Sequence, residues 1–243
     1  MQPLCHVDES SALLQFKESF IINGSDSSNK LACPLVQSTP TAVSWDGGIC
    51  DKDTGHVIDL DMSSSCLFGS VNSNSSLFQL VHLQRLNLAY NNFNYSQIPS
   101  QGRAWSLLID EKCTNATLPK FYGLDLASCN LSEFPHFLRN QDELQWLSLA
   151  YNNITGHVPE WMWNISIESL RVMDLSFNSL RGFDHFPIPL PWINLAILDY
   201  SSNQLEGSLP IPPFTTLRYH IPNNKLSGKI PQWICNMDFS TGA

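Results

Sequence analysis

The strongest constraint on this sequence is an internal repeat in which three apolar residues and one polar residue recur at fixed spacing. In the stretch LSLAYNNITG, which begins at residue 147, Asn152 follows leucines five and three residues earlier and precedes an isoleucine two residues later. The same frame fits seven polar landmarks: Ser65, Asn91, Cys129, Asn152, Asn178, Asn203 and Asn224. All 21 positions of the three flanking columns are apolar, although only 43% of the chain is hydrophobic. The chain therefore stacks copies of one structural unit.

The frame matches the leucine-rich-repeat consensus, L-x-x-L-x-L-x-x-N/C-x-L. The Leu-x-Leu pair predicts a short strand whose alternate side chains point inward. The landmark amide is expected to bond backbone groups of neighbouring coils, and Cys129 is then a buried structural thiol. Glycine stands four residues after the landmark in five coils, where we expect a left-handed bend: Gly69, Gly156, Gly182, Gly207 and Gly228.

We therefore predict an α/β leucine-rich-repeat solenoid, a right-handed horseshoe or superhelix. Short parallel strands should line its concave face, 3-10 or irregular segments its convex side, and a helix its N-terminal cap. The predicted organisation is a cap over residues 1–55, two repeats over 56–98, an irregular junction over 99–118, five repeats over 119–235 and an uncapped tail over 236–243. Pro222 falls within the expected strand of the last coil and predicts that this coil is deformed.

Composition places the chain outside the cytosol and away from polyanions. The formal charge is −9, which argues against nucleic acid or an anionic membrane surface as partner. No apolar stretch approaches the roughly 18–20 residues of a membrane span, and no secretion signal follows Met1. Seven cysteines and seven Asn-x-Ser/Thr sequons favour a secreted, N-glycosylated protein, extracellular although this chain shows neither signal peptide nor anchor. The sequons are at Asn23, Asn74, Asn94, Asn115, Asn130, Asn153 and Asn164.

The sequence predicts no catalysis, no cofactor and no metal. The histidines and cysteines lack metal-ligand spacing, and neither a nucleophile elbow nor a phosphate-binding glycine loop is present. Trp161, Trp163 and Trp233 follow a proline on the convex side, where packing is the ordinary explanation and a sugar-binding platform the less common one.

Function in this architecture lies on the concave face, where outward strand residues of successive coils form one surface. The residue between the paired leucines is aspartate in four coils, which gives an acidic stripe; Asp at this position is also explained by simple solvation or by capping from its neighbours. Large aromatics flank the stripe and favour a protein or peptide contact. The candidate ligand-binding residues are Arg85, Asn87, Tyr90, Asp125, Trp146, Ser148, Tyr151, Asp174, Phe177 and Asp199.

Five stretches carry a family resemblance. The repeat tails LEGSLP and LSGKIPQW, the N-terminal run CHVDESSALLQFKESF and the later SWDGGICD resemble plant receptor-like proteins. The segment LASCNLSEFPHFLRNQ is similar to sequences of the disease-resistance branch of that family. The resemblance implies an ectodomain that binds a protein or peptide in defence or developmental signalling. Because this family lacks a kinase of its own, it also implies a co-receptor kinase as partner.

The chain departs from the family pattern in two ways. Ala42 and Val43 stand where such caps usually carry adjacent cysteines, the partners of Cys5 and Cys50. We therefore expect a Cys5–Cys50 bridge, with Cys5–Cys33 as the competitor. The family's ectodomains also have many more repeats, so the chain resembles a truncated or internally deleted one. Two alternatives stay open: a secreted inhibitor of a cell-wall-degrading enzyme, similar to polygalacturonase inhibitors, or a non-functional truncated product.

Overall fold

The computed structural model describes residues 5–22, 48–69, 75–93, 119–185, 189–208 and 210–227. The chain divides into two compact units, Met1–His136 and Phe137–Ala243, and each is described by itself.

Unit 1 begins with helix α1 (Val7–Glu18), which buries Ala12, Leu13 and Phe16. Its first turn carries two acidic residues, which complement the positive end of the helix dipole. The helix contacts the 3-10 turn η2 (Ser76–Gln79), where Ser76 Oγ donates a 2.7 Å hydrogen bond to the carbonyl of Ala12. α1 thus packs as the helical cap that the sequence predicts.

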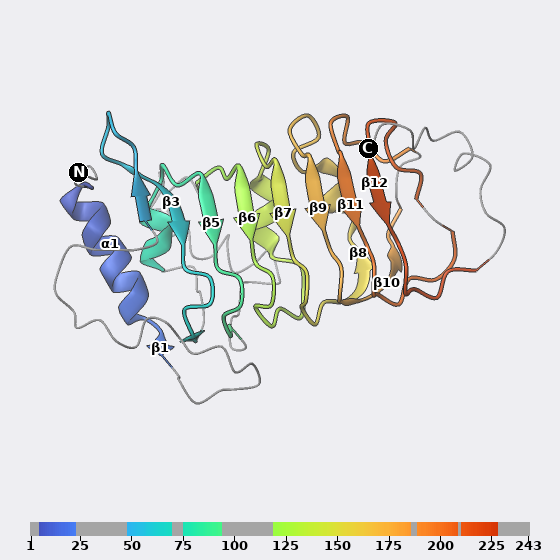
Figure 1. The fold of residues 1–243 in the computed structure, drawn as a ribbon, viewed down its shortest axis with the longest axis horizontal. Helices are drawn as coiled ribbons and strands as arrows, with labels where there is room; N and C mark the ends of the chain where they lie inside the picture. Colours follow the sequence, from blue (N-terminus) through green and yellow to red (C-terminus); the bar gives the residue numbers. More distant parts are fainter. Residues whose placement is uncertain are drawn as a thin grey trace, which may run out of the picture. The chain divides into compact units, whose positions relative to one another are not determined.

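The strands of unit 1 follow the repeat. β2 (Gly48–Cys50) pairs antiparallel with β3 (Val57–Asp61), and β5 (Arg85–Asn87) and β6 (Gly123–Asp125) continue in parallel, side by side in Figure 1. β1 (Ile21–Ile22) pairs antiparallel with β4 (Leu67–Phe68). One strand per coil in unbroken register places equivalent residues of successive coils beside one another.

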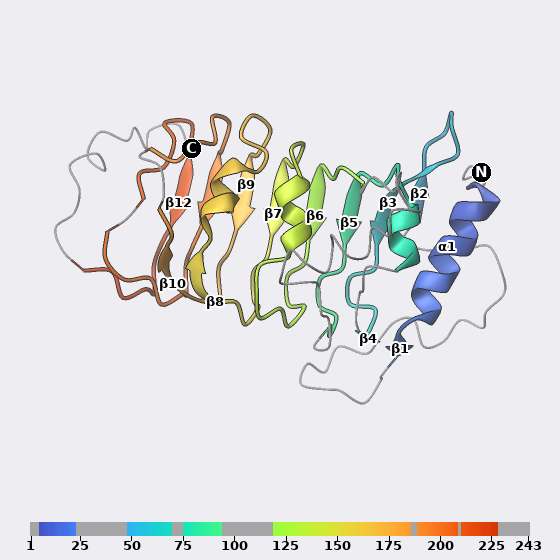
Figure 2. The same cartoon turned by 180° about the vertical axis from the view of Figure 1, so that it is seen from behind.

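Unit 2 repeats the same plan. Strands β7 (Trp146–Ser148), β9 (Val172–Asp174), β11 (Ile197–Asp199) and β12 (Arg218–His220) are parallel neighbours. A second parallel pair joins β8 (Thr155–Val158) to β10 (Ser179–Phe183). The 3-10 turn η3 (His136–Asn140) spans the boundary of the units, and η4 (Glu160–Asn164) follows β8. Figure 2 shows the yellow turn η4 in front of the unit 2 strands, so the irregular side of the coil faces away from the strand surface viewed in Figure 1.

The three apolar columns of the repeat form the core. All but three of their 21 side chains are buried, and the three half-buried ones, Tyr219, Ile221 and Leu226, belong to the last coil. The prediction of a leucine-rich-repeat solenoid with parallel strands and an N-terminal helix is confirmed.

The landmark asparagines satisfy backbone groups that neighbouring coils leave unpaired. Asn178 accepts from the Ile154 amide (3.0 Å) and donates to the carbonyls of Leu149 (2.9 Å) and Leu175 (3.2 Å). The same pattern is made by Asn91, Asn203 and Asn224. At the substitute landmark, Cys129 Sγ donates to the Leu88 carbonyl, and burial raises the pKa of this thiol far above its ordinary value. Cys129 is a structural thiol, because a thiol held protonated is a poor nucleophile.

The residue immediately before each landmark is left-handed in all seven coils, a regularity that the sequence analysis missed. Their φ values lie between 52° and 58°: Ser64, Tyr90, Ser128, Tyr151, Phe177, Ser202 and Asn223. The expected bend at the repeat glycines is real at Gly156 (φ 83°) and Gly207 (φ 78°). It is wrong at Gly182, which lies in β10; there a Cβ would approach His157 Nε2 to 3.3 Å.

The predicted deformation of the last coil is also wrong. β12 ends at His220, before Pro222, and the Pro222 carbonyl accepts from the Ser202 amide at 2.9 Å. Asn224 keeps its ladder bonds to neighbouring backbone groups. In five other coils the amide at the position of Pro222 bonds an Asp or Asn side chain two residues earlier, whereas His220 stands there in the last coil. Proline is tolerated because no amide is needed at this position.

Candidate functional site

In each unit the outward side chains of the strands form a candidate site, here called the strand face of that unit. Its central row in unit 1 is Asp61, Asn87 and Asp125, which are partners in register. In unit 2 the row is Ser148, Asp174, Asp199 and His220, again in register. The prediction that these polar residues line up across coils within each unit is confirmed.

The acidic residues of this row have a structural task. Each carboxylate, and the amide of Asn87, accepts the backbone N–H two residues later, at 2.8–3.0 Å. The bonds tie the strand end to the left-handed turn that follows. An Asp or Asn between the paired leucines is therefore explained by backbone capping, and an acidic stripe alone is no evidence for a ligand.

The second carboxylate oxygens are less uniform. Asp61 Oδ2 accepts from Asn87 Nδ2 at 3.2 Å, and Asp199 Oδ2 lies 3.2 Å from His220 Nδ1. The second oxygen of Asp174 has no polar partner among the described residues. In the neighbouring row Arg85 forms an ion pair with Asp59, so its charge is already partly committed.

Large aromatic residues stand at the same repeat position in both units, at one edge of each unit's strand face. Tyr90 (57% exposed), Tyr151 (51%) and Phe177 (44%) occupy the left-handed position before the landmark. The rings of Tyr151 and Phe177 are stacked, with centroids 4.1 Å apart and planes 8° from parallel. A bulky residue at positive φ is unusual, since the other four coils place Ser or Asn there. These aromatics stay largely exposed and have an unfavourable backbone conformation, so burial and local backbone geometry do not explain why they stand there.

An apolar row borders the other edge in unit 2. Trp146, 52% exposed, is in register with Val172, and Val172 with Ile197. Val172 and Ile197 are half-buried members of this row that the sequence analysis missed. Their signal was available, because they stand at the Trp146 position of the next two coils.

The tryptophans on the irregular side pack rather than form a site. Trp163 is buried, and its Nε1 donates to the Asp184 carbonyl at 2.9 Å. Trp192 is likewise buried, with Nε1 bonded to the Ile165 carbonyl. Trp161 lies under the guanidinium of Arg139, 5.0 Å from the ring centroid.

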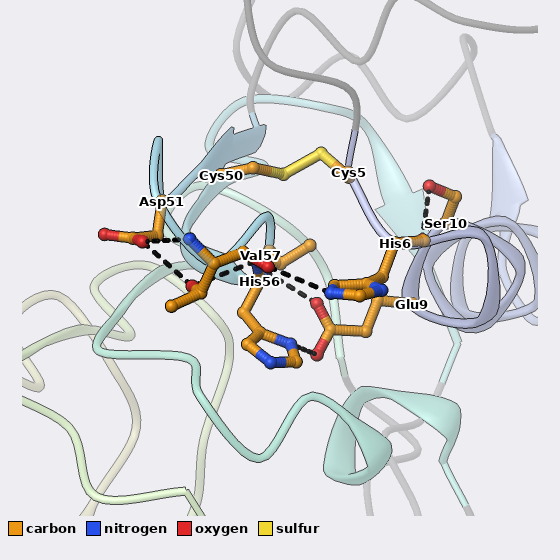
Figure 3. A network of polar contacts seen from close by, with 9 residues as sticks. Cys5, His6, Glu9, Ser10, Cys50, Asp51, His56 and Val57 are labelled. Atoms are coloured by element: carbon orange, nitrogen blue, oxygen red, sulfur yellow. Dashed lines mark hydrogen bonds and ion pairs between the residues drawn. A yellow bond between two sulfur atoms is a disulfide. The ribbon is translucent and has the colours of Figure 1, made fainter.

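The cap is a second polar cluster, drawn in Figure 3. Cys5 and Cys50 form a disulfide with Cα atoms 5.7 Å apart, the pairing expected from the family resemblance. Cys66 is also disulfide-bonded. Glu9 accepts from the Val57 amide (2.7 Å) and lies 3.0 Å from His56 Nδ1, which fastens α1 to β3.

The loop between β2 and β3 stabilises itself. The Asp51 carboxylate accepts from the amide and hydroxyl of Thr54 and from the amide of Asp53. These bonds hold the pKa of Asp51 below its ordinary value, with the Thr54 amide as the largest cause. The cap cluster is thus accounted for by folding.

Three sequons fall within the described residues. Asn153 and Asn164 are exposed, and Asn130 is half-buried. The sequons at residues 23, 74, 94 and 115 lie outside the described ranges, as do the predicted junction at 99–118 and the predicted tail at 236–243. Glycosylation stays a prediction.

The described residues contain no group of three or more His, Cys, Asp or Glu side chains placed to hold a metal ion. Within the same ranges, no helix has the length and apolar character that a membrane crossing requires.

Stacked coils, an asparagine ladder and a helical cap define a leucine-rich-repeat protein. The family model described as Leucine Rich Repeat matches residues 143–165. The chain is 39% identical over 172 residues to Receptor-like protein 47 of Arabidopsis thaliana, covering 65% of this chain and 21% of that protein. It is 34% identical over 280 residues to Receptor-like protein 6 of Arabidopsis thaliana, covering 99% and 28%. The chain belongs to the plant leucine-rich-repeat receptor-like proteins, and it spans about a quarter of the length of these relatives.

A solved structure shows the same fold. The leucine-rich-repeat ectodomain of the Arabidopsis receptor kinase HAESA, in complex with an IDA peptide hormone ligand, has a TM-score of 0.52 at 21% identity. The match covers 95% of this chain and 44% of that chain.

Proposed function

We propose that this chain is an extracellular ligand-recognition module of a plant receptor-like protein, which binds a protein or peptide on its strand face without catalysis. The observation that carries the proposal is the set of exposed aromatics at the left-handed position, Tyr90, Tyr151 and Phe177. Side chains of this kind contribute most of the binding energy at protein interfaces, because each offers a large, rigid contact area.

The relatives support this assignment in kind. They are receptor-like proteins, and a protein of the same fold holds a peptide hormone. By the same reasoning, the module faces the apoplast, carries N-linked glycans at exposed sequons such as Asn153 and Asn164, and signals through a co-receptor kinase. A role in defence or development follows from the family and not from any one residue.

A pull-down tests the proposal. The purified chain and its Tyr151→Ser/Phe177→Ser variant are incubated with plant apoplastic fluid or pathogen culture filtrate, and retained proteins and peptides are identified by mass spectrometry. Serine is compatible with the left-handed turn, as Ser202 shows, so we expect the variant to keep the fold. We expect species retained by the wild type and lost by the variant.

Two results would contradict the proposal. One is retention that does not differ between wild type and variant while both have the same circular dichroism spectrum. The other is inhibition of polygalacturonase by the purified chain, which would favour the inhibitor alternative.

A further inference from the structure

Unit 2 places two carboxylates next to each other on the strand face. Asp174 and Asp199 are partners in register on β9 and β11. Each is fixed by a bond from the amide two residues later, Ser176 at 2.9 Å and Ser201 at 2.8 Å. Like charges directly opposite one another destabilise a sheet, so this arrangement has a cost.

Unit 1 shows that the fold does not require that cost. There Asn87 stands in register between Asp61 and Asp125. Its Oδ1 accepts the Ala89 amide at 3.0 Å, which is the capping bond of this position, while its Nδ2 donates to Asp61. An asparagine thus caps the strand end as aspartate does and removes the repulsion. Capping therefore does not explain why unit 2 has aspartate at both position 174 and position 199.

Neither carboxylate of this pair has a lysine or arginine partner among the described residues. His220 reaches Asp199 Oδ2 at 3.2 Å, whereas the second oxygen of Asp174 has no polar partner among the described residues. The described residues hold no cluster able to bind a metal ion, so an organic cation suits the position better than a metal.

An aromatic surface lies beside the carboxylates. Phe177, three residues after Asp174, stacks one face of its ring on Tyr151. Phe177 is 44% exposed, and the next coil carries only the small Ser202 at the equivalent position, so that side of the ring has room for a ligand. Arginine fits both features, because its planar guanidinium stacks on an aromatic ring while its N–H groups pair with a carboxylate.

We propose that unit 2 binds an arginine side chain of a peptide ligand. The guanidinium lies on the open face of Phe177 and donates to Asp174, where it also relieves the repulsion between Asp174 and Asp199. An apolar side chain next to that arginine lies along the row of Trp146, Val172 and Ile197. This inference rests on the proposed function and names the chemistry of its ligand.

Selection from a random phage-displayed peptide library on the full 243-residue chain provides the probe. The strongest selected peptide is synthesised with arginine and with citrulline, which has the same shape and no charge. Binding of both is measured by calorimetry to wild type, Asp174→Ser, Asp61→Ser and Tyr151→Asn; serine stands at this position in the coil of Ser148 and, unlike asparagine, creates no glycosylation sequon here. We expect arginine to be enriched, and citrulline to weaken binding about tenfold in the wild type. The penalty should nearly vanish in Asp174→Ser and persist in Asp61→Ser, the matched control.

The outcomes separate the two claims. Peptides that lose affinity in Tyr151→Asn but show no preference for arginine over citrulline would overturn the inference and leave the proposed function intact. Failure to select any peptide would overturn this inference and leave a protein ligand for the proposed function, whereas binding that ignores every strand-face variant would overturn the proposed function as well. Displacement of the peptide by a neutral oligosaccharide such as cellohexaose would assign the surface to a sugar and also reject the arginine site.

Discussion

The rings of Tyr151 and Phe177 lie parallel, with centroids 4.1 Å apart, although the residues are 26 positions apart in the chain. They occupy the same place in consecutive coils, immediately before the landmark asparagine, and both have positive φ. The stack is exposed, so it removes little apolar surface from water. It follows that this edge of the strand face is kept at some cost in stability.

Tyr90 provides the simplest test of that cost, because no ring contact joins it to other described residues. Asparagine adopts left-handed geometry more readily than tyrosine, so Tyr90→Asn should raise the free energy of unfolding by about 1 kcal/mol. Phe177→Asn should change it less, since the loss of the stack offsets the backbone gain. Urea unfolding of both variants measures the difference. A Tyr90→Asn variant clearly less stable than wild type would show that the ring stabilises the fold.

The asparagine ladder should be far less tolerant of substitution. Asn178→Ala leaves the Ile154 amide without its acceptor and the carbonyls of Leu149 and Leu175 without the Nδ2 donor, so it should lower the free energy of unfolding by about 3 kcal/mol. Asn194→Ala is the matched control, because Asn194 is exposed and makes a single bond to the Glu168 carbonyl. Its cost should stay below about 1 kcal/mol. Equal losses in the two variants would refute a special role for the ladder.

The core could be predicted from the sequence because the three apolar columns of the repeat supply its side chains. Leu147 and Leu149 alternate within a strand, and that alternation fixes which side chains point inward. For Asp174 the sequence left capping, solvation and ligand binding open as interpretations. It could not decide among them, because the bond from the Ser176 amide depends on the turn that follows the strand. The left-handed residue before each landmark was not predicted. The repeat glycines predicted a left-handed bend four residues after the landmark instead, and large aromatic residues such as Tyr151 and Phe177 rarely adopt positive φ.

The sequence predicted which residues are exposed in the candidate site, but not which side chains contact one another there. Trp146, Tyr151 and Phe177 are exposed as expected. The pairing of Arg85 with Asp59 could not be read from the repeat, because side-chain reach between coils is not encoded in the column pattern. The Cys5–Cys50 bridge came from family resemblance alone, since seven cysteines allow many pairings.

Tyr200 offers a test at high pH. Its side chain is fully buried, and its hydroxyl has no hydrogen-bond partner among the described residues. Burial raises the pKa of Tyr200 well above 10, because the buried site disfavours the charged phenolate. The folded state therefore holds the phenol proton more tightly than the unfolded chain does. Stability is therefore complete below about pH 10 and falls as pH rises above that value, because only the unfolded chain ionises freely.

Tyr200→Phe removes both the buried hydroxyl and its titration. We expect stability at pH 7 to be unchanged or to rise by about 1 kcal/mol, and alkaline unfolding to move to higher pH. Circular dichroism followed from pH 7 to 12 measures both. A loss of more than about 1 kcal/mol at pH 7 would indicate that the hydroxyl has a partner after all.

The last prediction concerns the attachment of the cap. The carboxylate of Glu9 joins α1 to β3 through the Val57 amide and His56, close to the Cys5–Cys50 bridge (Figure 3). Glu9→Ala leaves the Val57 amide without its acceptor and should cost about 2 kcal/mol. Glu9→Gln should cost less, because the side-chain amide oxygen can still accept that bond.

Glu18→Ala, at the exposed end of the same helix, is the control and should stay within about 0.5 kcal/mol of wild type. Hydrogen exchange at the Val57 amide locates the effect: it should accelerate in Glu9→Ala and remain slow in the other two variants. An unchanged rate in Glu9→Ala would mean that the strand pairing of β3, and not Glu9, protects this end of the cap.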